Sequence, residues 1–150
     1  KISDGVAKIK LGISKELILG NLNSKRDIGN SKDYVKAMWL MLQQKNASDY
    51  VIATGETYTI REIVEMAFRV VGIKISWEGV GLKEVGKVNG KIVIRVSKQF
   101  YRTAEVDILI GDASKAKKEL GWEPEYDLAN TIKEMVEEDV KRLKEGRVEL

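Results

Sequence analysis

The sequence contains no cysteine and no histidine. Without cysteine the chain can form no disulfide bond and cannot perform thiol catalysis, and without histidine it lacks the commonest metal ligand and general base. Its apolar runs are short and interrupted by charge, far from the roughly 18 residues that span a bilayer. Charged residues also stand near the start, where a signal peptide would be apolar. We therefore expect a cytoplasmic protein without disulfides or membrane spans.

Proline occurs once, and no repeat, low-complexity tract or Pro/Gly/Ser-rich linker divides the 150 residues, which suit a single domain. The 26 basic and 23 acidic side chains are mixed along the chain and give a net charge of only +3. No basic stripe with interleaved aromatics is visible, so nucleic-acid binding is the least favoured function. The abundance of Lys and Glu is typical of proteins from hot environments, and a thermophilic source is our hypothesis.

Apolar spacing and capping residues predict a series of helices. They are expected over 3–11, from Asn30 or Ser31 onward, from the Thr59 and Glu62 capping box to Gly72, over 113–120 up to the stop at Gly121, and from Asp127 onward. The second helix is expected to bury Tyr34, Val35, Met38, Met41 and Leu42, and the last to bury Leu128, Ile132, Met135, Val136, Val140 and Leu143.

Short apolar or alternating runs predict strands at 17–19, 50–53, 75–78 and 91–96. Between the last two, residues 79–90 read as a long polar loop, and loops of this kind are often functional or mobile. Thr54 and Gly55 look like a phosphate cradle, but a single glycine supplies too few inward amides, so we interpret this turn as structural.

The stretch from Gly20 to Val35 carries the most specific signal in the chain. Lys25 and Arg26 follow a predicted strand, on a loop before a helix, where a connection can face a ligand. Arginine presents a planar fork of donors that can bind two phosphate oxygens at once. From the spacing of the residues alone, however, a solvated surface loop is the favoured interpretation.

Residues 19–44 contain Leu-Gly-Asn-Leu, Lys-Arg-Asp and Lys-Asp-Tyr-Val-x-Ala-Met-Trp-x-Met-Leu-Gln-Gln, and this stretch closely resembles GDP-mannose 4,6-dehydratases of the extended short-chain dehydrogenase/reductase superfamily. The same family's pattern continues in order through 49–57, Arg61-Glu62, 101–107, Lys115-Ala116-Lys117 and 120–124. The resemblance covers nearly the whole chain, but only the C-terminal part of the family's protein.

The resemblance implies an α/β fold: the C-terminal substrate-binding part of an extended Rossmann-type enzyme, with helices packed on a few short mixed strands and 1–150 as one domain. The family's reaction is an internal redox dehydration of GDP-mannose with tightly held NADP. Its Gly-rich loop and Tyr-x-x-x-Lys pair are absent here, because none of the five tyrosines has Lys four residues on. We therefore expect no catalytic residue, no bound cofactor and no activity in this chain alone.

The resemblance implies that the substrate-binding residues are Lys1, Asn21, Arg26, Arg102 and Glu105. The cations would face the diphosphate, and the carboxylate would accept ribose hydroxyls. Lys25 is the weakest candidate, and a surface salt bridge is the alternative interpretation for each charged residue. The chain departs from the family pattern at Ile28 (Trp in the family), Asn30 (His) and Thr103 (Pro).

The expected partners are GDP-mannose, the missing N-terminal Rossmann half and a second copy of the chain, since removing the parent sheet should expose apolar surface. Two alternatives remain open. One is a fragment of a related nucleotide-sugar epimerase, reductase or dTDP-sugar dehydratase, against which Thr-Gly-Glu-Thr at 54–57 and Arg-x-x-Glu-Val-Asp at 102–107 argue. The other is a free-standing binding or regulatory module.

Overall fold

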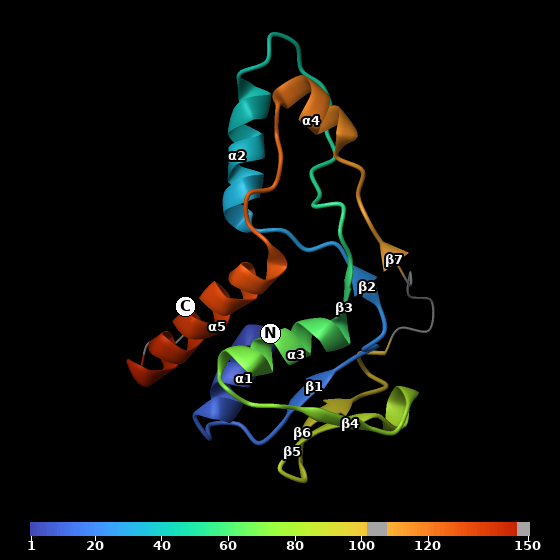
Figure 1. The fold of residues 1–150 in the computed structure, drawn as a ribbon, viewed down its shortest axis with the longest axis vertical. Helices are drawn as coiled ribbons and strands as arrows, with labels where there is room; N and C mark the ends of the chain where they lie inside the picture. Colours follow the sequence, from blue (N-terminus) through green and yellow to red (C-terminus); the bar gives the residue numbers. More distant parts are fainter. Residues whose placement is uncertain (102–107, 147–150) are drawn as a thin grey trace.

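Three helices and a four-stranded sheet form the larger part of the fold, which we call the body (Figure 1). The computed structural model describes residues 1–101 and 108–146. Helices α1 and α3 lie beside the sheet, and α5 packs against both of them. The elements of the body are α1 (Ile2–Lys10), β1 (Leu17–Leu19), α3 (Ile60–Val70), β4 (Ser76–Glu78), η1 (Gly81–Lys83), β5 (Val85–Val88), β6 (Lys91–Val96) and α5 (Leu128–Lys144).

The strands of the body follow the order β1-β6-β5-β4. β1 pairs with β6 in parallel, whereas β6, β5 and β4 form an antiparallel meander. Asn89 and Gly90 both have positive φ, as a tight hairpin turn between β5 and β6 requires. The prediction of a long loop over 79–90 is wrong, since β5 and η1 lie within it. The register of the β5–β6 pair shifts between Gly86 and Lys87. Such an irregularity interrupts the alternation by which a strand is recognised in the sequence.

The body's core joins the sheet to the helices. Phe68, Ile94 and Val136 are completely buried in it, each from a different element. The capping box at Thr59 and Glu62 is present, and Asp127 caps α5 by accepting from the amide of Asn130. Most predicted core positions of α5 are confirmed as buried or partly buried, but Met135 is half exposed.

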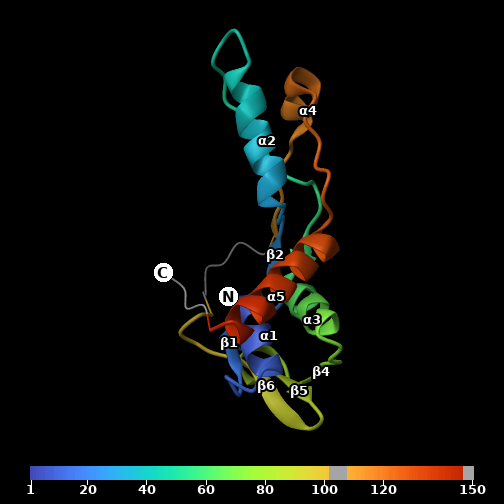
Figure 2. The ribbon, with the colours of Figure 1, turned by 90° about the vertical axis from the view of Figure 1, so that its left-hand side faces the viewer.

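An arm rises from the body in Figures 1 and 2. We use this name for α2 (Ser31–Leu42), α4 (Ser114–Leu120) and the segments 43–57 and 110–126. Its own small core surrounds the buried Trp122, with Ala37 of α2 and Ala116 and Leu120 of α4. Gly121 ends α4 in the left-handed conformation, as predicted from the sequence.

The predicted core face of α2 is partly wrong. Tyr34 and Met41 pack against the arm's core, but Val35, Met38, Trp39 and Leu42 are 62%, 60%, 60% and 81% exposed. These four lie at positions i, i+3, i+4 and i+7, so they form one stripe along the helix. α2 is therefore apolar on two sides, and only one of them is covered by described residues.

A second, three-stranded sheet connects arm and body. Its strands are β2 (Lys25–Arg26), β3 (Tyr58–Thr59) and β7 (Ile108–Leu109), in the order β3-β2-β7. β2 is antiparallel to β3 and parallel to β7. The predicted strand at 50–53 is not assigned, and this segment belongs to neither sheet.

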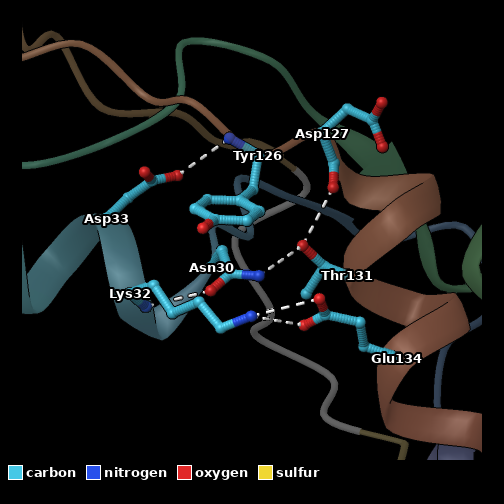
Figure 3. Close-up of polar contacts among 7 residues, drawn as sticks. All are labelled: Asn30, Lys32, Asp33, Tyr126, Asp127, Thr131 and Glu134. Carbon is cyan, nitrogen blue, oxygen red and sulfur yellow. Dashed lines mark hydrogen bonds and ion pairs between the residues drawn. The ribbon is translucent and has the colours of Figure 1, made fainter.

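The first turn of α2 is fastened to the start of α5 (Figure 3). Asn30 caps α2 through Oδ1, which accepts from the amide of Lys32 at 2.9 Å, and its Nδ2 donates to Thr131 Oγ1 at 3.0 Å. The carboxylate of Asp33 accepts from the amides of Glu125 and Tyr126 at 3.1 and 3.2 Å. Lys32 adds an exposed ion pair with Glu134. These contacts, which we call the junction, fix where the arm leaves the body.

The α/β fold with helices on short mixed strands is thus confirmed. Among the helices that the structure describes, none has both the length and the apolar character needed to cross a membrane.

Candidate functional site

Arg26 lies in β2, the central strand of the small sheet, rather than in the loop predicted from the sequence. Its backbone partners are Tyr58 in β3 and Leu109 in β7. The side chain is half-buried, and Nη1 donates to the carbonyl of Lys25 at 2.7 Å. A paired strand on each side fixes the backbone of Arg26, so its guanidinium is attached to a rigid part of the structure.

Lys25, the other cation of the pair, is exposed and lies close to α3. Hydrogen bonds from the amide and hydroxyl of Thr59 lower the pKa of Glu62, and the charge of Lys25 lowers it further. The ammonium of Lys25 therefore already has a carboxylate nearby. This agrees with the prediction that Lys25 is the weakest of the candidate substrate-binding residues.

The side chain of Lys1 contacts Phe100, which immediately precedes Tyr101. Its ammonium lies 3.9 Å from the centre of the Phe100 ring, a cation–π contact. Gly20 lies against the same residue, because a Cβ on Gly20 would collide with the carbonyl oxygen of Phe100. Lys1 and the Gly20–Asn21 turn thus converge on one residue from different parts of the sequence.

Asn21 is half-buried, and its Oδ1 accepts from the amide of Asn23 at 3.0 Å. This local bond shapes the turn between β1 and β2. Arg102 and Glu105, the remaining predicted ligands, lie outside the described residues, as does Thr103. The described residues on either side are held at the candidate site, since Phe100 contacts Lys1 and Ile108 pairs with Lys25.

Arg61 supports this turn from α3. It donates from Nη2 to Asn23 at 2.9 Å and to the buried Glu84 at 3.0 Å, and Nη1 also bonds Glu84. The guanidinium lies 4.9 Å from the ring of Trp77. The ion pair with Glu84 raises the pKa of Arg61, so the guanidinium stays charged and keeps the turn and the η1 segment together.

Asp27 is the residue that the sequence analysis missed. Its Oδ1 accepts from the amide and hydroxyl of Thr54 at 3.0 and 2.7 Å, and its Oδ2 accepts from the amides of Gly55 and Gly111 at 2.9 and 3.5 Å. One carboxylate therefore joins the end of β2 to segments 27 and 84 residues away. Since Arg26 directly precedes Asp27, these bonds also fix the position of Arg26, the candidate substrate-binding residue.

Burial raises the pKa of Asp27, but the hydrogen bonds from Thr54, Gly55 and Gly111 outweigh it and leave the pKa below its usual value. A carboxylate that accepts several bonds is stabilised in its charged form. The same bonds use the amides of Thr54 and Gly55, so the interpretation of this turn as structural rather than phosphate-binding agrees with the geometry.

Neither of the two glycine turns beside Arg26 and Asn21 forms a cradle for a dinucleotide. The site would need a glycine-rich turn whose amides face the pyrophosphate. Gly55 donates its amide to Asp27, and Gly20 is pressed against Phe100, so neither provides such a cradle. In 1–101 and 108–146 no cluster of carboxylates could hold a metal ion either.

A groove of about 460 Å³ between α1 and α5 lies beside Lys1. Its other charged residues are Asp4, Glu134, Glu138 and Asp139, a setting that disfavours an anion. This acidic groove therefore offers no support for an anion bound at Lys1.

Comparison with known proteins gives a family match over residues 1–135, to the model described as GDP-mannose 4,6 dehydratase. The chain is 46% identical over 148 residues to the GDP-mannose 4,6 dehydratase of Dictyostelium discoideum, covering 97% of this chain and 42% of that protein. It is 49% identical over 146 residues to the human GDP-mannose 4,6 dehydratase, covering 96% and 39%. The chain thus spans less than half the length of these curated relatives.

Solved structures share the fold at lower identity. RMD from Pseudomonas aeruginosa complexed with NADPH matches with a TM-score of 0.74 and 19% identity, over 94% of this chain and 41% of that one. UDP-glucose 4-epimerase from Thermotoga maritima matches with a TM-score of 0.70 and 23% identity, over 95% and 40%.

Proposed function

The chain belongs to the GDP-mannose 4,6-dehydratase family, and we propose that it is the part of such an enzyme that holds the nucleotide sugar. The observation that carries the proposal is the family match over 1–135. Identities of 46% and 49% to proteins named for GDP-mannose favour that sugar nucleotide over the uridine sugars of the more distant epimerases.

In the proposed complex, Arg26 binds the diphosphate from the rigid central strand β2. Lys1 adds a second cation from the N-terminus of α1, and Asn21 lines the nucleotide side of the turn. Arg102 and Glu105, which lie outside the described residues, keep the roles expected from the sequence. Two or three cations would offset the charge of the diphosphate, and the bidentate arginine would set its orientation.

The chain's own residues bind and orient; they include none of the groups that perform the family's redox chemistry. NADP belongs, in this proposal, to the part of the relatives that the chain does not span. We therefore expect no conversion of GDP-mannose to GDP-4-keto-6-deoxymannose by this chain alone, with or without added NADP. Measurable turnover by the purified chain would contradict that expectation.

Calorimetric titration with GDP-mannose tests the binding role. GDP-mannose should bind more tightly than UDP-glucose or dTDP-glucose, and Arg26→Ala should weaken its binding by about tenfold, the usual scale for a lost charge-assisted contact. Arg26→Lys should recover part of the loss. Arg69→Ala, at an exposed arginine near the end of α3, is the control and should have no effect.

The same comparison can be made in a chimera, in which this chain replaces the matching 148-residue portion of the Dictyostelium discoideum relative. There the readout is turnover of GDP-mannose. A chimera that prefers a uridine sugar, or in which Arg26→Ala has no effect on KM, would overturn the proposal.

A further inference from the structure

Residues 20–24 form the turn between β1 and β2, which we call the binding turn because two proposed substrate-binding residues depend on it. Asn21 lies in the turn, and Arg26 follows it in β2. Within the turn, the amide of Asn23 donates to Oδ1 of Asn21, but one exposed hydrogen bond contributes little to stability. The position of the binding turn therefore depends on the elements that it contacts.

The first turn of α3 holds the binding turn through its backbone. The amide of Ile60 donates to the carbonyl of Ser24 at 3.1 Å, and the amide of Arg61 donates to the carbonyl of Leu22 at 3.0 Å. The first amides of a helix have no partner inside the helix, so they can bond another segment. Here that segment is the binding turn, which is thereby fastened to α3.

The side chain of Arg61 adds a second connection to the same turn. Its Nη2 donates to Oδ1 of Asn23 at 2.9 Å. Asn23 therefore bonds on two sides, with its side chain to Arg61 and with its backbone amide to Asn21. A movement of the guanidinium would move Asn23 and, through it, the side chain of Asn21.

Two other side chains keep the guanidinium of Arg61 in place. Glu84 is buried and bonds both Nη1 and Nη2. The ring of Trp77 lies 4.9 Å from the guanidinium, and its Nε1 donates to Glu65 at 2.7 Å, which fixes the ring. A buried carboxylate that loses its cation is strongly destabilised, so Arg61 stays on Glu84. The guanidinium thus presents Nη2 to Asn23 in a fixed direction.

Glu84 comes from the segment that the sequence predicted as a long polar loop. Its amide donates to the carbonyl of Gly81 at 3.1 Å, which closes η1. Gly79 has a φ of 81°, and a Cβ there would collide with the carbonyl oxygen of Lys83. The connection from β4 to β5 is therefore a tight turn that places Glu84 beside Arg61.

We propose that Arg61 is a positioning residue for the nucleotide sugar: anchored by Glu84, it sets the binding turn that carries Asn21 without itself touching the ligand. The proposal rests on the proposed function, because it requires that residues of this turn bind GDP-mannose. It gives α3 and the β4–β5 connection, which contain none of the predicted substrate-binding residues, a part in substrate affinity as well as in stability.

Asn23→Ala cuts the connection and leaves the Arg61–Glu84 pair intact. Because Asn23 is exposed, the thermal midpoint should change by no more than about 2 °C. Calorimetric titration should show GDP-mannose bound about fivefold more weakly, and Asn23→Asp, which can still accept from Arg61, should restore the affinity to within about twofold. Asn130→Ala is the matched control: it also removes an exposed amide bonded to a charged side chain, that of Asp127, and should leave binding unchanged.

The chimera with the Dictyostelium discoideum relative separates positioning from a purely structural role. Asn23→Ala should raise KM for GDP-mannose about fivefold with little change in kcat, whereas a variant that only destabilised the fold would reduce the amount of active enzyme and leave KM unchanged. Arg61→Lys should raise KM as well, and adding Asn23→Ala to it should raise KM no further, because Arg61 acts through Asn23. Additive effects would mean that Asn23 contacts the ligand directly and would overturn the inference.

Hydrogen exchange of the free chain tests the positioning without a ligand. The backbone amide at position 23 should exchange at least about tenfold faster in Asn23→Ala than in the wild type, because the turn is held less firmly. Unchanged exchange would overturn the inference, and so would unchanged affinity in a variant of a chain whose wild type binds GDP-mannose. A wild type that binds no GDP-mannose would instead refute the proposed function, and the exchange at position 23 then decides whether Arg61 sets the turn.

Discussion

The side-chain amide of Asn30 bridges two helices: its Oδ1 caps α2, and its Nδ2 lies 3.0 Å from Oγ1 of Thr131 in α5 (Figure 3). Thr131 in turn donates to the carbonyl of Asp127 at 2.9 Å, so its hydroxyl is oriented to accept from Asn30. Asn30 and Thr131 are both buried. The residue that departs from the family's histidine therefore has a structural partner of its own.

A double-mutant cycle should reveal this bridge. Thr131→Val keeps the shape but leaves Nδ2 of Asn30 buried without an acceptor, at a cost of about 1–3 kcal/mol. Asn30→Ala removes both cap and bridge and should cost about 2 kcal/mol. In urea denaturation the double variant should lose clearly less than the sum, because once the Asn30 amide is gone the valine leaves no donor without an acceptor. Strict additivity would mean that the bridge contributes nothing.

Asp27→Asn should destabilise the protein by about 2 kcal/mol although the volume is unchanged. The amide can accept from Thr54 through its oxygen, but its NH₂ group would then face the amides of Gly55 and Gly111, which are also donors. Asp112→Asn is the control, since Ser114 is the only donor to Asp112 among residues 1–101 and 108–146 and an amide oxygen can replace the carboxylate there. A chemical denaturation experiment in which both variants behave alike would contradict the role of Asp27.

The same residue should make stability depend on acid pH. The pKa of Asp27 is lowered in the folded state, so its contribution is complete above the unfolded value near 3.8 and is lost as pH falls through the lower folded value. The difference in unfolding free energy between wild type and Asp27→Asn should therefore be constant near neutral pH and shrink below about pH 4. A difference that grows on acidification would reverse the sign of the effect.

Ser24→Ala should leave the stability unchanged or raise it by about 1 kcal/mol. The Ser24 hydroxyl is buried beside β2 and has no hydrogen-bond partner in the described structure. Removing it relieves an unsatisfied polar group and creates almost no cavity. Thermal and urea unfolding both measure this; a loss above about 1 kcal/mol would show that the hydroxyl has a partner after all.

Arg61→Lys should cost about 1–2 kcal/mol, because an ammonium cannot bond Glu84 through two nitrogens while also reaching Asn23. Glu84 is buried, so the lost bonds are not replaced by water. Arg95→Lys is the matched control: its pair with Glu16 is exposed and should contribute below about 1 kcal/mol. Thermal unfolding of the two variants, measured side by side, tests whether Arg61→Lys is the more destabilising.

The sequence predicted those features whose signals are local. Thr59 and Glu62 are three residues apart, Gly121 directly follows the last turn of α4, and Asp127 caps its own helix; all three were found. The apolar period of α2 was also correct, but a helix with two apolar sides does not indicate which side is covered by this chain. Val35, Met38 and Leu42 were therefore assigned to the wrong environment.

The candidate site was predictable only in part, because some of its contacts join residues that lie far apart in the sequence. Arg26 could be found from the resemblance and from the chemistry of its side chain. Asp27 could not be recognised from spacing, because its partners Thr54 and Gly111 lie 27 and 84 residues away. β2 was missed as a strand because two residues cannot display an alternation.

The junction has a consequence for engineering. The chain enters the arm next to Asn30 and again at 110, and leaves it after 57 and at Tyr126; the bonds of Asp33 fasten the first and last of these crossings together. At the far tip, residues 43–49 are exposed along their whole length (Figure 1). A peptide tag or new chain termini placed there would interrupt no core contact, so this turn is the natural place to split or permute the protein without separating its halves.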